Sequence, residues 1–427
     1  MKENHRIRRR MAGVIKARLP DLKLDSVKDP RKARGKRWKL DVLLKTSVTA
    51  MACRCKSLAQ TEDLSKEMGS GMRKLLGTNR RVPDTTLRNL MVRLSPSQLR
   101  PCLYRQAKAA HRRKALKPEG LPFGVVAIDG KSTAIDAWDK RYAQRHRDAY
   151  GKSAVGLVRT LTCSLVSSRP KICMDTVPIP AATNEMGYFQ NAFGQLCRVY
   201  KSLFELVTTD AGMCCLENAH IIIKQKKHYL FGLKQDQPTL FTEAKRLLAH
   251  QDKPEAETID VVSGSEVRRC LYLTEEMAGY GNWRHLKTVL RVESVKTDLK
   301  SGRVVDVESR YFISSLGIDR LSRKQWLRVI REHWAVENQC HGTFDMAFEE
   351  DDRPWIRMDP QGTLVVMLLR RMAYNLLTLF RSVTQRSEER RQIAWKAMMR
   401  WMYQAAITLS EQNVASLRTR QSALVKI

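Results

Sequence analysis

Apolar residues first recur with helical spacing just after Trp38. The residues that form this first stripe are Leu40, Leu43, Leu44 and Val48. Steps of three and four residues place side chains on one face of a helix, and a second stripe follows Asp84. We therefore predict a helical domain over residues 38–116 with many Arg and Lys side chains on its outer faces. This pattern suits both a DNA-binding domain and a helical bundle with a solvated basic surface.

The hydrophobic period changes after Pro122, where the run from Phe123 to Asp129 is short, apolar and rich in strand-forming residues. Such a run predicts a buried central strand that ends in a carboxylate. The elements predicted after it are strands near 155–166 and 172–179, a helix over 185–200, a strand over 203–210, a helix near 213–226 and a strand over 228–233. The fourth strand again ends in an acid, Asp210. This order of elements predicts the first part of a ribonuclease H-like α/β core over residues 120–250.

Strand signals continue over residues 251–318, with a hairpin that turns at Lys300-Ser301-Gly302. The segment is too long for an ordinary connection, so it predicts a β-rich insertion between the core sheet and the next helices. Residues 319–427 are predicted to hold a catalytic helix and C-terminal helices. The apolar stretch over 362–382 contains Arg370-Arg371, and we expect it to pack in the core and not to cross a membrane.

The helix that follows the insertion carries a distinctive polar face. Its apolar side chains at helical steps are Trp326, Ile330, Trp334, Phe344 and Phe348. On the same helix His333, Glu337 and His341 lie four residues apart and share one face. A carboxylate between two imidazoles fits either a metal site or a chance arrangement on an exposed helix, and the helix alone does not decide between them.

Residues 1–37 are rich in basic side chains and contain Pro20 and Pro30. They predict a poorly ordered basic arm or a lightly structured lead-in. Such an arm would either lie along a nucleic-acid backbone or act as a solubilising tail.

The charge of the whole chain narrows the class of partner. Its 427 residues carry 77 Lys and Arg against 44 Asp and Glu, a formal net charge of +33. This excess is typical of a protein that covers phosphates, so a nucleic acid is the expected partner. The sequence shows neither a signal peptide nor a long uncharged apolar run, which favours a cytoplasmic protein with no membrane. The ten cysteines form no C-x-x-C pair, and we expect them to be reduced and mostly buried.

Three carboxylates occupy defined places in the predicted core. Asp129 ends the first strand, Asp210 ends the fourth, and Glu337 lies on the helix after the sheet. In a ribonuclease H-like core these places meet at one edge of the sheet. Three such carboxylates can hold two Mg²⁺ or Mn²⁺ ions, which assist the attacking and leaving oxygens of a phosphodiester. Taken singly, Asp129 and Asp210 also fit turn residues and Glu337 fits a surface acid.

Several blocks of the chain resemble a known family. The main blocks are Ala127–Lys131, Thr209–Gly212, and His333–Asn338 with His341, Asp345, Phe348 and Glu350-Asp351. Further similar blocks are Arg81–Thr86, Thr183–Glu185, Leu233-Lys234 with Gln237, and Arg310–Ser315. In this order they resemble the bacterial insertion-sequence transposases of the DDE class, and more narrowly the H-repeat-associated type. The resemblance extends over roughly residues 38–380.

The resemblance implies a fold, an activity and a set of site residues. The implied fold is a ribonuclease H-like mixed sheet with a β-rich insertion, an N-terminal helical domain and C-terminal helices. The implied activity is metal-dependent cleavage of double-stranded DNA at transposon ends, followed by strand transfer into target DNA by a protein that is at least a dimer. Asp129, Asp210 and Glu337 would be the catalytic and metal-binding residues. Lys131, Lys234 and Arg331 would contact DNA phosphates, although each also fits an ordinary surface cation.

The chain departs from the family pattern in two places. A charged residue commonly lies seven positions after the glutamate, but here that position is Phe344, and Asp345 follows one step later. The residues after Lys131 also lack the usual basic side chain. Neither departure affects the three carboxylates, but both affect the predicted DNA contacts.

Two other functions remain open at the level of sequence. One is a ribonuclease H-like nuclease without strand transfer. The other is an inactive or domesticated remnant that still binds DNA. The sequence leaves the terminal repeats, the target preference and the excision route undetermined.

Overall fold

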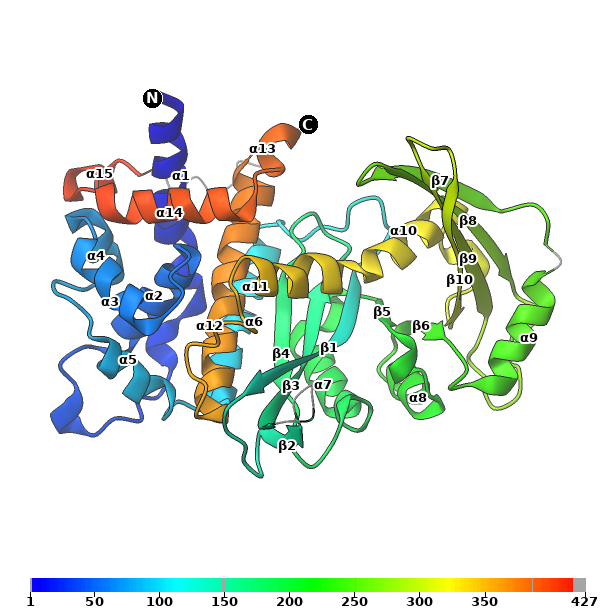
Figure 1. Cartoon of the computed structure of the whole chain (residues 1–427), viewed down its shortest axis with the longest axis horizontal. Coiled ribbons are helices and arrows are strands. Elements are labelled where there is room, and N and C mark those ends of the chain that lie inside the picture. The colour runs from blue at the N-terminus through cyan, green and yellow to red at the C-terminus, as the bar shows by residue number, and fades with distance from the viewer. Residues whose placement is uncertain (1, 148–150, 152, 250, 386, 418–427) are drawn as a thin grey trace.

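Strand β1 (Val125–Ile135) is an interior strand of a ten-stranded sheet in the computed structural model. The structure describes residues 2–147, 151, 153–249, 251–385 and 387–417. The helical end of the molecule, the sheet and the last four strands follow one another along its longest axis (Figure 1).

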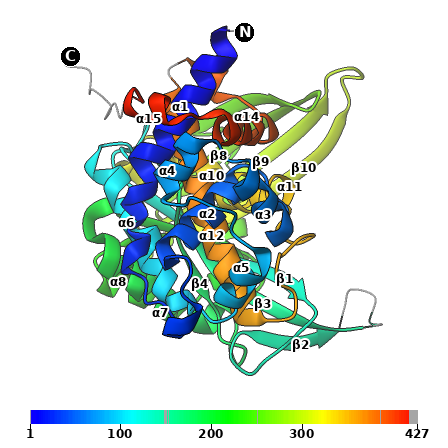
Figure 2. The ribbon, with the colours of Figure 1, turned by 90° about the vertical axis from the view of Figure 1, so that its left-hand side faces the viewer.

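The predicted ribonuclease H-like order is confirmed by the strand pairings. The core strands are β1, β3 (Ala154–Leu165), β4 (Cys173–Pro178), β5 (Leu206–Thr209) and β6 (His228–Leu233). Strand β3 pairs antiparallel with both β1 and β4, and β5 pairs parallel with both β1 and β6. The resulting order β4-β3-β1-β5-β6 is that of a ribonuclease H-like fold. A short strand that the hydrophobic pattern did not predict, β2 (Ala143–Arg147), pairs with the first half of β3 and projects from the body of the molecule (Figure 2).

The predicted end of the first strand at Asp129 is wrong. Strand β1 runs on to Ile135 because its antiparallel pairing with β3 extends from Val126 to Ile135. Its parallel pairing with β5 covers only Val125–Ala127. Asp129 therefore lies within β1, yet just beyond the point where β1 and β5 separate.

The region predicted as a separate β-rich insertion continues the same sheet. Its strands are β7 (Ala256–Val262), β8 (Ser265–Thr274), β9 (Thr288–Asp298) and β10 (Val304–Ser314). The end of β10, from Tyr311 to Ser314, pairs antiparallel with β6. The hairpin between β9 and β10 turns at Gly302, which has a positive φ of 64°. Apolar side chains at the end of β10 join the core, whereas its first half is exposed.

Helices cover both faces of the sheet. The helices on one face are α7 (Glu185–Tyr200), α8 (Leu216–Lys224) and α9 (Pro238–Ala249), which pack against alternate residues such as Val126 and Ile128. On the other face α10 (Arg323–His333) packs Trp326 and Ile330 against Val125 and Ala127. Alternate side chains of β1 therefore enter two different cores, as expected of a central strand.

The first and last helices of the chain share one hydrophobic core. The N-terminal helices are α1 (Lys2–Arg18), α2 (Leu40–Ala52), α3 (Leu58–Glu67), α4 (Ser70–Leu76), α5 (Asp84–Met91) and α6 (Pro96–Arg112). The later helices are α11 (Gly342–Met346), α12 (Pro360–Leu379), α13 (Glu388–Arg391), α14 (Trp395–Thr408) and α15 (Glu411–Ala415). Helix α12 packs against α2 and α6, and α14 packs against α1 (Figure 1). The regions predicted as separate helical domains thus form one structural unit.

Residues 1–37, predicted as a basic arm or a lightly structured lead-in, contain a long helix in the part that the structure describes. Residues Lys2–Arg18 form α1, and Ile7, Met11 and Ile15 recur at four-residue steps on its buried face. This stripe packs among the C-terminal helices, and Lys16 Nζ donates a hydrogen bond to the carbonyl of Val414 at 2.9 Å. The density of basic residues near its start hid an amphipathic helix.

Helix α12, continued by a π-helical turn at Phe380–Thr384, is long and apolar enough to cross a membrane. Its most apolar window is nevertheless entirely buried inside the fold, so α12 is a core helix, as the sequence predicted. The ten cysteines are free, and all except Cys55 and Cys215 are buried.

Candidate active site

The three predicted carboxylates come from three adjoining elements. Asp129 lies within β1, Asp210 directly follows β5, and Glu337 lies in the π-helical turn η7 (Val336–His341). All three side chains are half-buried. Burial raises the pKa of Asp210 and of Glu337, and the negative charge of Asp129 raises each pKa further. Because one carboxylate acts on both others, the three acids belong to one site.

The turn that carries Glu337 interrupts the predicted single helix. Helix α10 begins at a capping box formed by Ser322 and Gln325, and it ends at His333. The chain then winds with the wider π-helical pitch before α11 begins at Gly342. A π-helical turn holds more residues than an α-helical turn and is found frequently at functional sites.

The same turn accounts for the shifted charge after the glutamate. Since η7 accommodates an additional residue, side chains after it are displaced by one position relative to a regular helix. Phe344 is buried and packs on Tyr374 at 5.1 Å between ring centroids. The side chain of Asp345 instead reaches β1, where it accepts a hydrogen bond from Lys131 Nζ at 2.7 Å.

Asp210 has an oxygen atom without a partner. Its carboxylate accepts hydrogen bonds from the backbone N–H groups of Gly212 and Met213, which oppose the rise in its pKa. Its Oδ1 atom is nevertheless buried and accepts no hydrogen bond from any residue that the structure describes. A buried carboxylate oxygen in this state is costly unless a ligand completes it.

Both histidines of the predicted His-Glu-His face reach the site. His333 is 3% exposed, and its Nδ1 lies 3.0 Å from Thr208 Oγ1. Burial lowers the pKa of His333 to about 4, so the ring is neutral at neutral pH. His341 Nδ1 lies 3.2 Å from Asp129 Oδ2, while its Nε2 is buried without a hydrogen-bond partner among the described residues.

A fourth carboxylate, Glu185, was not predicted as a site residue. It is the first residue of α7, and burial together with the charges of Asp129 and Asp210 raises its pKa. A methyl group on Gly130 would overlap the Glu185 carboxylate, so the glycine allows this close approach. Two features of the sequence could have identified Glu185 as a site residue. One is the block Thr183–Glu185, which resembles the family, and the other is the glycine after Asp129.

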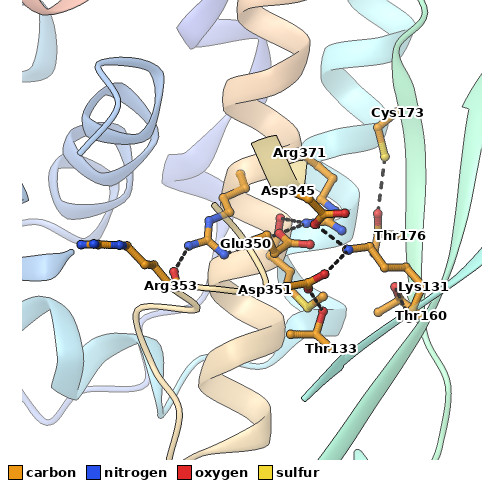
Figure 3. Close-up of polar contacts among 12 residues, drawn as sticks. Lys131, Thr133, Thr160, Cys173, Thr176, Asp345, Glu350, Asp351, Arg353 and Arg371 are labelled. Carbon is orange, nitrogen blue, oxygen red and sulfur yellow. Dashed lines mark hydrogen bonds and ion pairs between the residues drawn. The ribbon is translucent and has the colours of Figure 1, made fainter. Parts of the chain in front are cut away.

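The prediction that Lys131 contacts DNA is not supported by its position. The Lys131 side chain is 7% exposed, and its Nζ lies 2.7 Å from Asp345 Oδ1 and 2.9 Å from Asp351 Oδ2. Burial would lower the pKa of Lys131, but Glu350 and these two aspartates outweigh it and the pKa is raised. Lys131 is therefore a cation within an internal network (Figure 3).

The network continues from Lys131 into the helical core. Glu350 is fully buried and forms ion pairs with Arg371 and, at 3.6 Å, with Arg370 of α12. Burial would raise the pKa of Glu350, but the two guanidinium groups outweigh it and the pKa is lowered. Asp351 also accepts a hydrogen bond from Thr133 at 2.8 Å. The acidic segment after η7 thus links β1 to the helix at the centre of the molecule (Figure 3).

The other two predicted basic residues are exposed at the edges of the site. Lys234 follows β6, and its positive charge opposes the rise in the pKa of Asp210. Arg331 lies 3.0 Å from Asp260 of β7 and lines a groove of about 440 Å³ beside α10. Trp334 lines the same groove and is half-buried, with Arg310 stacked over its ring at 4.2 Å.

The residues of the site suit a hard divalent cation. Carboxylate oxygens are the donors that Mg²⁺ and Mn²⁺ prefer, and Asp210 Oδ1 is a buried donor without a partner. The pKa values of Asp210 and Glu337 are raised by burial and, to a smaller extent, by nearby negative charge, and a cation would relieve this repulsion. In the described part of the chain, however, no group of three or more His, Cys, Asp or Glu side chains is arranged so that it could hold a metal ion.

Comparisons with known proteins agree with the sequence blocks. Residues 22–106, in the N-terminal helical region, match the family described as DDE_Tnp_1-associated. The chain is 24% identical over 337 residues to "Putative protein YbfL" of Escherichia coli (strain K12), covering 76% of this chain and 82% of that protein. It is 27% identical over 238 residues to "H repeat-associated putative transposase YhhI" of the same organism, covering 53% of this chain and 57% of that protein. The predicted resemblance is confirmed by these similarities.

A solved structure is also similar in outline. It is the piggyBac transposase in a synaptic complex with hairpin DNA, with a TM-score of 0.43 and 11% sequence identity. The alignment covers 95% of this chain and 78% of that chain.

Proposed function

We propose that this protein is a DNA transposase of the DDE class that cleaves double-stranded DNA at transposon ends and transfers the freed strand to target DNA. The observation that carries the proposal is the meeting of Asp129, Asp210 and Glu337 at the separation of β1 and β5, where one acid raises the pKa of the other two. The similarity to a protein named as an H-repeat-associated transposase supports the choice of reaction.

The side chains of the site have separable tasks in this proposal. Asp129, Asp210 and Glu337 would hold two Mg²⁺ or Mn²⁺ ions, which supply positive charge to the attacking and leaving oxygens of a phosphodiester. His333 stays neutral and, through Thr208, fixes the end of α10 against β5. His341 lies against Asp129 and orients its carboxylate.

DNA as the substrate is supported by the charge on either side of the carboxylates. The chain has a net charge of +33, and Lys324, Arg328 and Arg331 line the groove beside α10. On the other side, Arg145 and Arg147 are exposed on the projecting strand β2. Phosphate contacts of this kind give affinity that falls as salt rises. Bringing two transposon ends together requires at least a dimer.

The proposal is tested with Asp129→Asn and the matched control Asp306→Asn, which changes an exposed acid of β10. We expect Asp129→Asn to lower Mg²⁺-dependent cleavage of terminal DNA by at least about a thousandfold, because one ligand carboxylate is lost. DNA binding, measured by salt-dependent fluorescence anisotropy, should stay within about twofold of the wild-type value. If Asp129→Asn retained cleavage, the assignment of Asp129 as a catalytic, metal-binding residue would be wrong.

A second substrate separates the alternatives. DNA ends that have been cut beforehand should be joined to target DNA by the wild-type protein. Cleavage without joining would identify a nuclease of the same fold. Salt-dependent DNA binding with neither activity would identify a remnant that only binds DNA.

A further inference from the structure

Glu185 reaches the carboxylates from the face of the sheet opposite to Glu337. Side chains alternate along a strand, so Asp129 points toward the α10 face together with Ala127, while Ile128 points toward the α7 face. Gly130 has the same orientation as Ile128 but carries no side chain. Glu185, at the start of α7, occupies the space that a side chain at position 130 would fill.

The local structure holds Glu185 in this place without using its carboxylate. Asn184 caps α7 by accepting a hydrogen bond from the Gly187 N–H at 2.9 Å. Arg159 of β3 donates a hydrogen bond to the carbonyl of Thr183 and so fixes the chain before the helix. The carboxylate of Glu185 accepts no hydrogen bond from the residues that the structure describes. Its position therefore does not follow from capping or packing alone.

Two other atoms at the same place also lack partners. Asp210 Oδ1 and His341 Nε2 are buried without hydrogen bonds within the described residues, and His341 is only 8% exposed. Glu185 therefore lies beside Asp129 through Gly130, and the charges of Asp210 and His341 also reach it. The start of α7 and the charge of Arg159 suit a carboxylate at position 185, but they do not explain the unpartnered atoms of Asp210 and His341. A bound cation accounts for those atoms and for the carboxylates beside them.

We propose that Glu185 is a fourth carboxylate ligand of the divalent cations, and that Gly130 is the opening through which it reaches them. This inference rests on the proposed function, because it adds a ligand to the same site. It assigns α7 a direct part in metal binding, in addition to β1, β5 and η7.

The test measures Mn²⁺ binding to the full chain without DNA, by electron paramagnetic resonance of the unbound ion. We expect Glu185→Gln to weaken binding of at least one ion about tenfold or more. The matched control is Glu217→Gln, which changes an exposed glutamate in the first turn of α8 and should bind Mn²⁺ as the wild type does. Gly130→Ala keeps every charge but displaces Glu185, so it should also weaken binding.

A second readout separates a ligand from a structural residue. Without metal, Glu185→Gln removes repulsion between like charges, so its melting temperature in EDTA should equal or exceed that of the wild type. Its gain in melting temperature on addition of Mn²⁺ should be smaller. A structural glutamate would instead lower the melting temperature in EDTA and leave the gain unchanged.

The outcomes distinguish this inference from the proposed function. Wild-type Mn²⁺ affinity in both Glu185→Gln and Gly130→Ala, together with weakened binding in Asp129→Asn, would overturn the role of Glu185 and leave the proposed function standing. Unchanged Mn²⁺ binding in Asp129→Asn would overturn both.

Discussion

Two groups of acids lie beside β1 at positions only two residues apart, and the pKa values in the two groups shift in opposite directions. The first surrounds Asp129 and includes Asp210, Glu337 and Glu185, whose pKa values are raised by burial and mutual repulsion. The second surrounds Lys131 and contains Glu350 and Asp351, whose pKa values are lowered because the pairing cations outweigh burial. Asp345 is an exception in the second group, since burial raises its pKa despite the bond to Lys131.

The difference lies in the source of the compensating charge. Around Lys131 the chain supplies a lysine and two arginines of its own. Near Asp129 the imidazole of His333 is held neutral by burial, so it adds no positive charge. A fold that can bury Glu350 between two guanidinium groups could have compensated Asp129 in the same way. Under the proposed function, the acids of the first group would therefore be available for a cation from solution.

The largest expected effect comes from breaking the second group at Glu350. Glu350→Gln leaves the buried Arg370 and Arg371 without a counter-charge, which should lower the free energy of unfolding by about 3–5 kcal/mol. The measurement is urea-induced unfolding followed by circular dichroism, with and without Mn²⁺. Added Mn²⁺ should not restore the lost stability, because the missing negative charge lies beside Arg370 and Arg371 and not at the proposed metal site.

The control for this change is Glu349→Gln. Glu349 pairs with Lys56 at 2.7 Å and with Arg54 at 3.2 Å, but these partners are about one third exposed. Its loss should cost less than about 1 kcal/mol. An equal loss of unfolding free energy in Glu350→Gln and Glu349→Gln would show that burial of the ion pair does not determine its contribution to stability.

The second prediction concerns the neutral imidazole of the first group. The pKa of His333 is about 4 in the folded protein and near 6.5 in an unfolded chain. Between these values the unfolded chain binds a proton that the folded protein does not. The stabilisation from neutral His333 is thus complete above pH 6.5 and is lost as pH falls toward 4, by up to roughly 3 kcal/mol.

The His333→Asn substitution retains a polar partner for Thr208 but cannot titrate. The fall in stability from pH 6.5 to 4 should therefore be smaller in His333→Asn than in the wild type, measured by chemical unfolding at each pH. His111→Asn, at an exposed position of α6, should keep the wild-type dependence. An unchanged slope in His333→Asn would mean that His333 is not held neutral.

The smallest expected effect is that of Lys131→Met. Lys131 is buried, but its partners Asp345 and Asp351 have side chains that are 39% and 43% exposed and can regain water. We expect a loss of about 1–2 kcal/mol in the free energy of unfolding, well below that of Glu350→Gln. Thermal unfolding with Lys300→Met, an exposed turn residue, as control would measure it. If Lys131→Met lost more unfolding free energy than Glu350→Gln, Lys131 would contribute more than Glu350 to the stability of the network.

The core topology was predictable because its signals are local. Short apolar runs that end near Asp129 and Asp210 mark central strands, and their order relative to the helices is that of the ribonuclease H-like fold. The places of the three carboxylates follow from this order. The extension of β1 to Ile135 was not predictable, because it depends on pairing with β3 and the residues after Gly130 carry no apolar alternation of their own.

Features that depend on distant contacts escaped prediction. The role of Lys131 depends on Asp345 and Asp351, which lie more than 200 positions later in the chain. The π-helical turn at Glu337 leaves no compositional mark, since its residues also suit an α-helix. The contact between Glu185 and Gly130 can be recognised only in the folded structure, where the start of α7 lies against β1.

The shared core of the first and last helices has a consequence for synthesis. Helices α1 and α2 pack against α12 and α14. The helices that leave the ribosome first therefore lack their packing partners until residues some 350 positions later have been synthesised. The segment that bears Glu337 is anchored to α12 through Glu350 and Arg371. A chain interrupted before residue 371 would contain all four carboxylates but lack the anchor that holds them in register. If the proposed function is correct, competence for catalysis would be acquired only near the completion of translation.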